Sequence, residues 1–63
     1  MKFYLTFGQQ SPFKNGFIIV KANDYLEARN KVIQKFDLKW SNLYREEEFE
    51  EEYFPKGAYE VIE

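Results

Sequence analysis

The segment that decides the fold is residues 17–36, FIIVKANDYLEARNKVIQKF. It opens with a short apolar run in which Ile18, Val20 and Ala22 occupy alternate positions, so residues 17–22 are a predicted strand. The positions between them are also largely apolar. This pattern predicts a central strand, or a strand covered by a helix on one face and by a partner on the other.

A helix follows directly, because a capping signal and an apolar stripe occur in register. Asp24 is the predicted N-cap, and Glu27 three residues later completes a capping box. Lys35 falls in the last turn, where its positive charge complements the helix dipole. The helix is predicted to end near Asp37. Its apolar stripe has four-residue spacing and consists of Ala28, Val32 and Phe36, flanked by Tyr25 and Ile33.

Three further strands are predicted around this unit. Residues 2–7 alternate between apolar and polar side chains, and the Asn15-Gly16 pair predicts a hairpin turn into the next strand. Residues 39–44 and 58–62 supply the third and fourth strands.

Between the last two strands lies the acidic segment (residues 46–52), EEEFEEE. Glutamate favours helix, although each pair of like charges one turn apart costs about 0.2–0.5 kcal/mol. We expect a short helix that Phe49, Tyr53 and Phe54 hold against the sheet and that Pro55 ends. The predicted fold is a single α+β domain, residues 1–63. It is a small two-layer domain with a mainly antiparallel four-stranded sheet, one main helix and a short acidic helix, in the order ββαβαβ.

The composition of the chain excludes most kinds of catalytic and metal site. The 63 residues include no cysteine and no histidine, so disulfides, thiolate nucleophiles, the commonest general base and the usual zinc ligands are missing. Three scattered glycines cannot form a phosphate-binding loop. We therefore expect no enzyme activity, catalytic residue, cofactor or metal site. No signal peptide or membrane-spanning apolar run is present, so we expect a cytoplasmic protein without a membrane partner.

Charge is divided unevenly along the chain. Residues 1–44 hold seven basic and three acidic side chains, whereas residues 45–63 hold two basic and eight acidic ones. Four interpretations of the acidic segment remain open: a solvated face, a contact surface for a basic groove, a divalent-cation site, or carboxylate catalysis. The spacing matches no calcium loop, and clustered carboxylates lack the two different environments that acid–base catalysis needs.

Aromatic side chains offer a second candidate surface. Thirteen residues are Phe, Tyr or Trp, enough to build a core from a short chain. If exposed near lysines, Tyr4, Phe13 and Phe17 could instead stack nucleobases, although the acidic segment would repel phosphates. Phe13, in the tip of the first connection, either folds back onto the core or contacts a partner. Exposed Phe17 and Ile19 would favour a homodimer.

The two ends of the chain resemble a known group of sequences. The matching residues are the opening Phe3-Tyr4-Leu5-Thr6-Phe7-Gly8 and the closing Trp40-x-x-Leu43-Tyr44 with Tyr53-Phe54-Pro55-x-Gly57. With the capped helix between them, the chain resembles short uncharacterised proteins of tailed bacteriophages and prophages over nearly its whole length. The resemblance implies a phage setting but no established activity. Members of the group carry a longer first loop with histidines, so no role of that loop transfers to this chain.

This setting shapes the functional expectation. Small acidic phage proteins without catalytic residues often block a host protein that holds nucleic acid, such as a CRISPR, restriction or repair factor. We expect a non-enzymatic accessory protein in the host cytoplasm whose partner is a host or phage protein with a basic surface. The alternatives are a structural, self-associating phage protein and a weak single-stranded nucleic-acid binder. The predicted partner-binding residues are Glu46, Glu47, Glu48, Glu50, Glu51, Glu52, Phe13 and Phe17.

Overall fold

The structure, a computed structural model, describes residues 1–63. The chain forms four strands, one α-helix and two short 3₁₀ turns. In chain order these are β1 (Lys2–Thr6), β2 (Gly16–Lys21), α1 (Tyr25–Phe36), β3 (Asn42–Arg45), η1 (Glu46–Glu48), η2 (Glu51–Tyr53) and β4 (Gly57–Ile62). No helix of the protein has the length and apolar character needed to cross a lipid bilayer.

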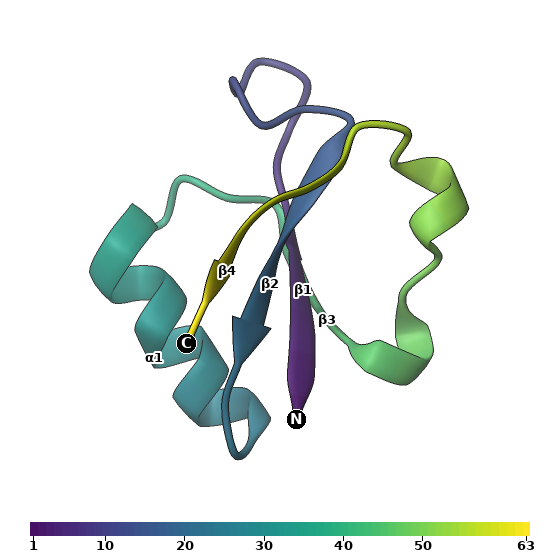
Figure 1. The fold of residues 1–63 in the computed structure, drawn as a ribbon. Coiled ribbons are helices and arrows are strands. Elements are labelled where there is room, and N and C mark those ends of the chain that lie inside the picture. Colours follow the sequence, from purple (N-terminus) through teal and green to yellow (C-terminus); the bar gives the residue numbers. More distant parts are fainter.

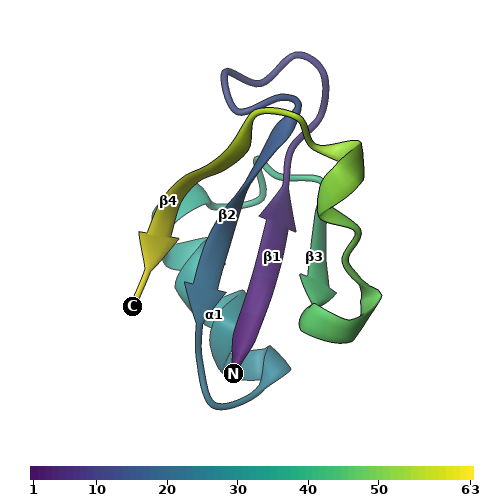
Figure 2. The ribbon, with the colours of Figure 1, turned by 45° about the vertical axis from the view of Figure 1, so that its right-hand side comes forward.

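The four strands form one mixed sheet in the order β3-β1-β2-β4. β1 is antiparallel to both of its neighbours, and Tyr4 lies opposite Ile19 on β2 and opposite Tyr44 on β3. β4 occupies the far edge and runs parallel to β2, as Figure 2 shows. The prediction of a mainly antiparallel sheet is therefore right for β1 and its neighbours and wrong for β4.

The parallel direction of β4 requires a long connection before it. β3 and β4 run the same way, so the chain after β3 must return to the opposite end of the sheet before β4 begins. It returns over the face that α1 leaves free, so α1 and the acidic segment lie on opposite sides of the sheet (Figure 1). The domain thus has three layers, where the sequence predicts two.

The acidic segment forms two 3₁₀ turns, where the sequence predicts a short α-helix. Phe49 and Glu50 separate the two turns, and both have extended backbones, with φ −95° and ψ 136° at Phe49. A continuous helix would place like charges one turn apart along its length. The extended backbone at Phe49 also turns its ring toward the sheet. The predicted acidic helix, and the ββαβαβ order that includes it, are therefore wrong.

The main core lies between the sheet and α1. Its fully buried side chains come from alternate positions of β1 and β2 and from one face of α1: Phe3, Leu5, Ile18, Val20, Ala28 and Val32. Asp24 caps α1, because its carboxylate accepts a hydrogen bond from the backbone N–H of Glu27 at 2.8 Å. The predicted helix, its N-cap and the burial of Ala28 and Val32 are confirmed, whereas Phe36 is only half-buried. The predicted capping box does not form, because the Glu27 carboxylate accepts the backbone N–H of Asn23 and not that of Asp24.

Asp37 ends α1 in a conformation that residues with a Cβ atom rarely adopt, with φ 58° and ψ −125°. Its backbone N–H donates to the carbonyl of Ile33 at 2.8 Å. Its own carbonyl accepts the indole N–H of Trp40 at 2.9 Å. These contacts hold the backbone in a strained region. Glycine at this position would keep both hydrogen bonds without the strain.

We expect Asp37→Gly to raise the free energy of unfolding by about 1 kcal/mol, because the strain relieved exceeds the added flexibility of the unfolded chain. Asp37→Asn is the control, since it removes the unfavourable negative charge at the helix C-terminus but keeps the Cβ atom. Urea unfolding followed by circular dichroism measures both variants. If Asp37→Gly were no more stable than Asp37→Asn, the backbone at this position would not be strained.

Candidate functional site

Two phenylalanines attach the acidic segment to the sheet. The Phe49 ring stacks on the Tyr4 ring, with 4.5 Å between centroids and 6° between planes. It also meets Phe17 edge-on at 4.9 Å and stacks with Phe54 at 5.0 Å. Aromatic contacts of this kind contribute about 0.5–1.5 kcal/mol each beyond the area that they bury. The glutamates are therefore displayed from a backbone that is held in place.

The sheet face beneath the acidic segment is aromatic and covered. Tyr4 on β1 is 8% exposed and Phe17 on β2 is 2% exposed. The alternative in which these two rings are exposed and stack nucleobases is wrong, because Phe49 and Phe54 pack on them. The second apolar face of β2 is thus covered by the chain itself and not by a partner. It offers no free surface on which nucleobases could stack.

All six carboxylates of the acidic segment lie on the surface of the protein. They belong to Glu46, Glu47, Glu48, Glu50, Glu51 and Glu52, each of which is exposed. The two ion pairs of the protein lie elsewhere, between Lys21 and Glu63 at 3.5 Å and between Lys35 and Glu60 at 2.6 Å. None of the six carboxylates is therefore neutralised by an ion pair.

Arg45 directly precedes the acidic segment but does not neutralise it. Its guanidinium lies over the Tyr25 ring, 4.6 Å from the centroid, on the α1 side of the sheet. Its backbone N–H donates to the Glu48 carboxylate at 3.1 Å, which stabilises the start of η1. The layer opposite α1 consequently carries uncompensated negative charge.

The carboxylates do not converge on a common point. No group of three or more side chains of the metal-binding types is arranged to hold a metal ion. Separate exposed carboxylates accept hydrogen bonds from lysine and arginine side chains. This arrangement can therefore present negative charge to a partner.

The sequence predicts that Tyr53 and Phe54 both hold the acidic segment against the sheet, but only Phe54 does so. Tyr53 is 71% exposed beside the glutamates, whereas Phe54 is half-buried with its ring 6.3 Å from that of Phe17. Pro55 disfavours helical backbone at Phe54, which lies directly after η2 with φ −129° and ψ 77°. An exposed aromatic ring among charged groups is typical of interface anchors, so Tyr53 joins the candidate surface.

Phe13 lies on the other side of the sheet, in the connection between β1 and β2. Its half-buried ring packs at 4.9 Å from Phe7, 5.9 Å from Phe36 and 5.3 Å from Tyr59. Of the predicted contact residues, the structure therefore groups the six glutamates on one layer. It places Phe17 beneath them and Phe13 away from them.

The acidic segment also affects the pKa of Tyr4, the tyrosine beneath it. Burial raises the pKa of the Tyr4 phenol above its ordinary value of 10.0, and the negative charges of Glu46 and Glu51 raise this pKa further. The folded protein therefore holds the phenolic proton more tightly than the unfolded chain does, so ionisation of Tyr4 opposes folding.

The stability that depends on neutral Tyr4 is expected to be fully present below about pH 10 and to be lost as the pH rises through the raised pKa. Tyr4→Phe cannot ionise, so its alkaline loss of stability should be smaller than that of the wild-type protein. Urea unfolding between about pH 8 and about pH 11 measures the difference. Tyr53→Phe, which alters an exposed ring of the same layer, is the control. Equal alkaline losses in the wild-type and Tyr4→Phe proteins would contradict the prediction.

Comparison of the chain with protein-family models, with curated proteins and with solved structures gives no match. The function is therefore inferred from the contacts, exposure and charges of this chain.

Proposed function

We propose that this protein is a small non-enzymatic accessory protein of a phage or prophage that binds a partner protein with a basic surface. The observation that carries the proposal is the layer opposite α1. Six exposed carboxylates without ion pairs stand there on a backbone that Phe49 and Phe54 attach to the sheet. Negative charge at fixed positions favours association with a positive surface and speeds the encounter.

Inhibition by competition with nucleic acid is the mechanism that suits this charge. Basic grooves that hold DNA or RNA make most of their contacts with phosphate oxygens. Carboxylates at fixed positions offer a similar potential and similar hydrogen-bond acceptors. In this proposal Tyr53 adds an apolar contact, and the protein occupies the groove of a host defence or repair factor, in the host cytoplasm, so that nucleic acid is excluded.

The test compares two variants with the same net charge. Glu47→Gln, Glu50→Gln and Glu52→Gln together remove three exposed carboxylates that make no hydrogen bond within the protein. The matched control carries Gln9→Lys, Gln10→Lys and Asn30→Lys, which raises the net charge by the same amount at exposed positions outside the acidic segment. Each tagged protein is used to capture partners from bacterial lysate treated with nuclease, at low and moderate salt.

We expect the wild-type and control proteins to retain a partner whose capture weakens with salt. The glutamine variant should retain about tenfold less of it, since each exposed charge pair contributes roughly 0.5 kcal/mol. Equal capture by the glutamine variant would contradict binding through the acidic segment. Equal loss in both variants would mean that overall charge, and not this surface, governs capture.

Self-association through β4 is a second candidate function, and one observation favours it. β4 is an edge strand whose Val61 is 46% exposed and whose Tyr59 is 39% exposed. Edge strands with exposed apolar side chains pair readily with other strands. Light scattering should then show a mass that rises with concentration and returns to the monomer mass in Val61→Lys. A strict monomer at high concentration would contradict it.

A further inference from the structure

A pocket of about 710 Å³ opens between the C-terminal end of α1 and the connection from β1 to β2. This volume lies within the range of about 300–1,000 Å³ that is typical of small-molecule sites. The C-terminal end of α1 borders the pocket. α1 and the acidic segment lie on opposite sides of the sheet (Figure 1). The role of the pocket is therefore separate from the proposed binding of a basic partner.

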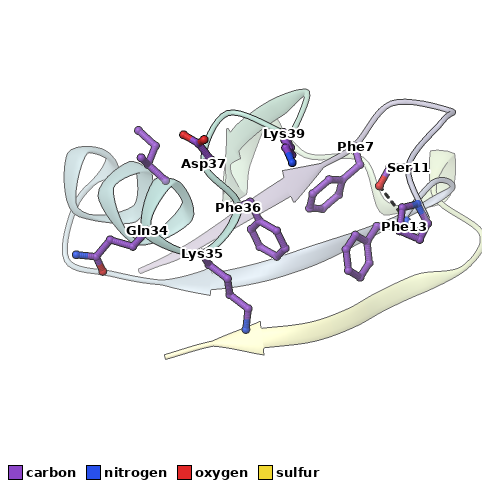
Figure 3. Close-up of a pocket in the computed structure, with 10 residues that line it drawn as sticks. Phe7, Ser11, Phe13, Gln34, Lys35, Phe36, Asp37 and Lys39 are labelled. Atoms are coloured by element: carbon purple, nitrogen blue, oxygen red, sulfur yellow. Dashed lines mark hydrogen bonds between the residues drawn. The ribbon is translucent and has the colours of Figure 1, made fainter.

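Three phenylalanine rings, two from the connection between β1 and β2 and one from the end of α1, form the apolar part of the pocket together with Ile33. Phe7 follows β1, Phe13 belongs to the connection and Phe36 ends α1, and Figure 3 shows their rings side by side. The ring centroids are 4.9 Å apart for Phe7 and Phe13, 5.3 Å for Phe7 and Phe36, and 5.9 Å for Phe13 and Phe36. Such tilted and edge-to-face packing leaves ring surface to which a further aromatic ring can add.

The rim of the pocket is positively charged. Lys35 and Lys39 lie on opposite sides of the rings (Figure 3). The only carboxylate among the residues that line the pocket is that of Asp37. Lys35 already pairs with Glu60 at 2.6 Å, and the other ion pair of the protein involves Lys21, so Lys39 has no carboxylate partner. The rim therefore contains a cation that is free to bind an anionic group.

We propose that this pocket binds a small aromatic acid, whose ring packs against Phe13 and Phe36 while its carboxylate pairs with Lys39. The phenylalanines select the ring, because aromatic pairs gain from edge and offset geometry beyond the area that they bury. Lys39 selects the acid over neutral and cationic analogues by charge. The hydroxyl of Ser11, which accepts the backbone N–H of Phe13 at 3.1 Å, keeps its own proton free to donate to the ligand.

The test is a titration of the ¹⁵N-labelled full chain, followed by amide and indole N–H shifts in NMR spectra. The probes are 2-naphthoate, its neutral counterpart 2-naphthamide, and the saturated acid decahydro-2-naphthoate. Trp40 is the only tryptophan, and its indole N–H donates to the carbonyl of Asp37, which lines the pocket, so its signal reports changes at the pocket rim. We expect 2-naphthoate to shift this signal and the amides of Phe13 and Lys39. It should bind about threefold more tightly than the amide and about fivefold more tightly than the saturated acid.

Three variants test the assignment of roles. Lys39→Gln should abolish the preference for naphthoate over naphthamide, whereas Lys2→Gln, the same change at an exposed position outside the pocket, should preserve it. Phe13→Leu should weaken naphthoate binding about fivefold while the spectrum shows that the fold is retained. Absence of shifts at the pocket, equal affinity for the amide, or equal effects of the two lysine variants would each overturn the proposal.

Discussion

Replacing Phe49 by alanine is expected to lower the free energy of unfolding by about 2–3 kcal/mol. The ring stacks on Tyr4 and Phe54 and meets Phe17 edge-on, so its removal exposes the sheet face and loosens the acidic segment. Phenylalanine-to-alanine changes at fully buried sites lower the free energy of unfolding by about 3–5 kcal/mol. Phe49 is half-buried, so we expect a smaller loss. Urea unfolding followed by circular dichroism measures this loss.

Tyr53→Ala is the matched control for Phe49→Ala. It removes an aromatic ring of similar size from the same layer, but one that is 71% exposed, so its cost should stay within about 0.5 kcal/mol. The two variants also separate stability from function, because Tyr53→Ala should weaken partner capture in a protein that remains folded. Equal stability of the two variants would show that Phe49 does not hold the acidic segment to the sheet.

Gly16→Ala is expected to destabilise the protein by about 1–3 kcal/mol, as overpacking of a close contact does. Gly16 is buried and lies opposite Gly57, where β2 and β4 begin to pair. A Cβ atom at this position would lie 2.7 Å from the backbone carbonyl oxygen of Gly57 and would overlap the Tyr59 ring. The ring could move, but the carbonyl belongs to the strand pairing. The expected result is therefore separation of β4 from β2, visible as faster hydrogen exchange in β4.

Gly8→Ala makes the same chemical change at a position with open space. No heavy atom lies within 4 Å of a Cβ atom built there, and the backbone of Gly8 does not have a positive φ. The free energy of unfolding of the Gly8→Ala protein should stay the same or rise by about 0.5 kcal/mol, because alanine restricts the conformations of the unfolded chain. If Gly16→Ala matched Gly8→Ala in stability, the close approach of β2 and β4 would not constrain residue 16.

The helix and the hairpin could be predicted from neighbouring residues. The N-cap of Asp24 involves the backbone three residues later, and the buried Ala28 and Val32 repeat at one helical turn. The pairing of β1 with β2 depends on a turn and on simple alternation, and Leu5 and Ile18 meet in the register that buries both. These features depend on contacts that are short in sequence or repeat at a fixed period.

The candidate site was predicted only in part. The sequence identifies the acidic segment, and the structure places its six carboxylates on the surface. The sequence also predicts that Phe49 holds this segment against the sheet. It does not identify Tyr4 and Phe17 as the residues that Phe49 contacts, because the three rings come from separate parts of the chain. Alternation marks Phe17 as facing away from α1, but the same alternation fits an exposed ring and a covered one.

By itself, the sequence determined the small α+β class, the capped helix with its buried stripe and the separation of basic from acidic residues along the chain. Only the tertiary structure decided that β4 runs parallel to β2, that the acidic segment covers the second face of the sheet, and that Phe13 and Phe36 border a pocket. The physical reason is the range of the interactions. Propensity, capping and periodicity act within a few residues, whereas the direction of an edge strand and the cover of a sheet face depend on packing between distant segments.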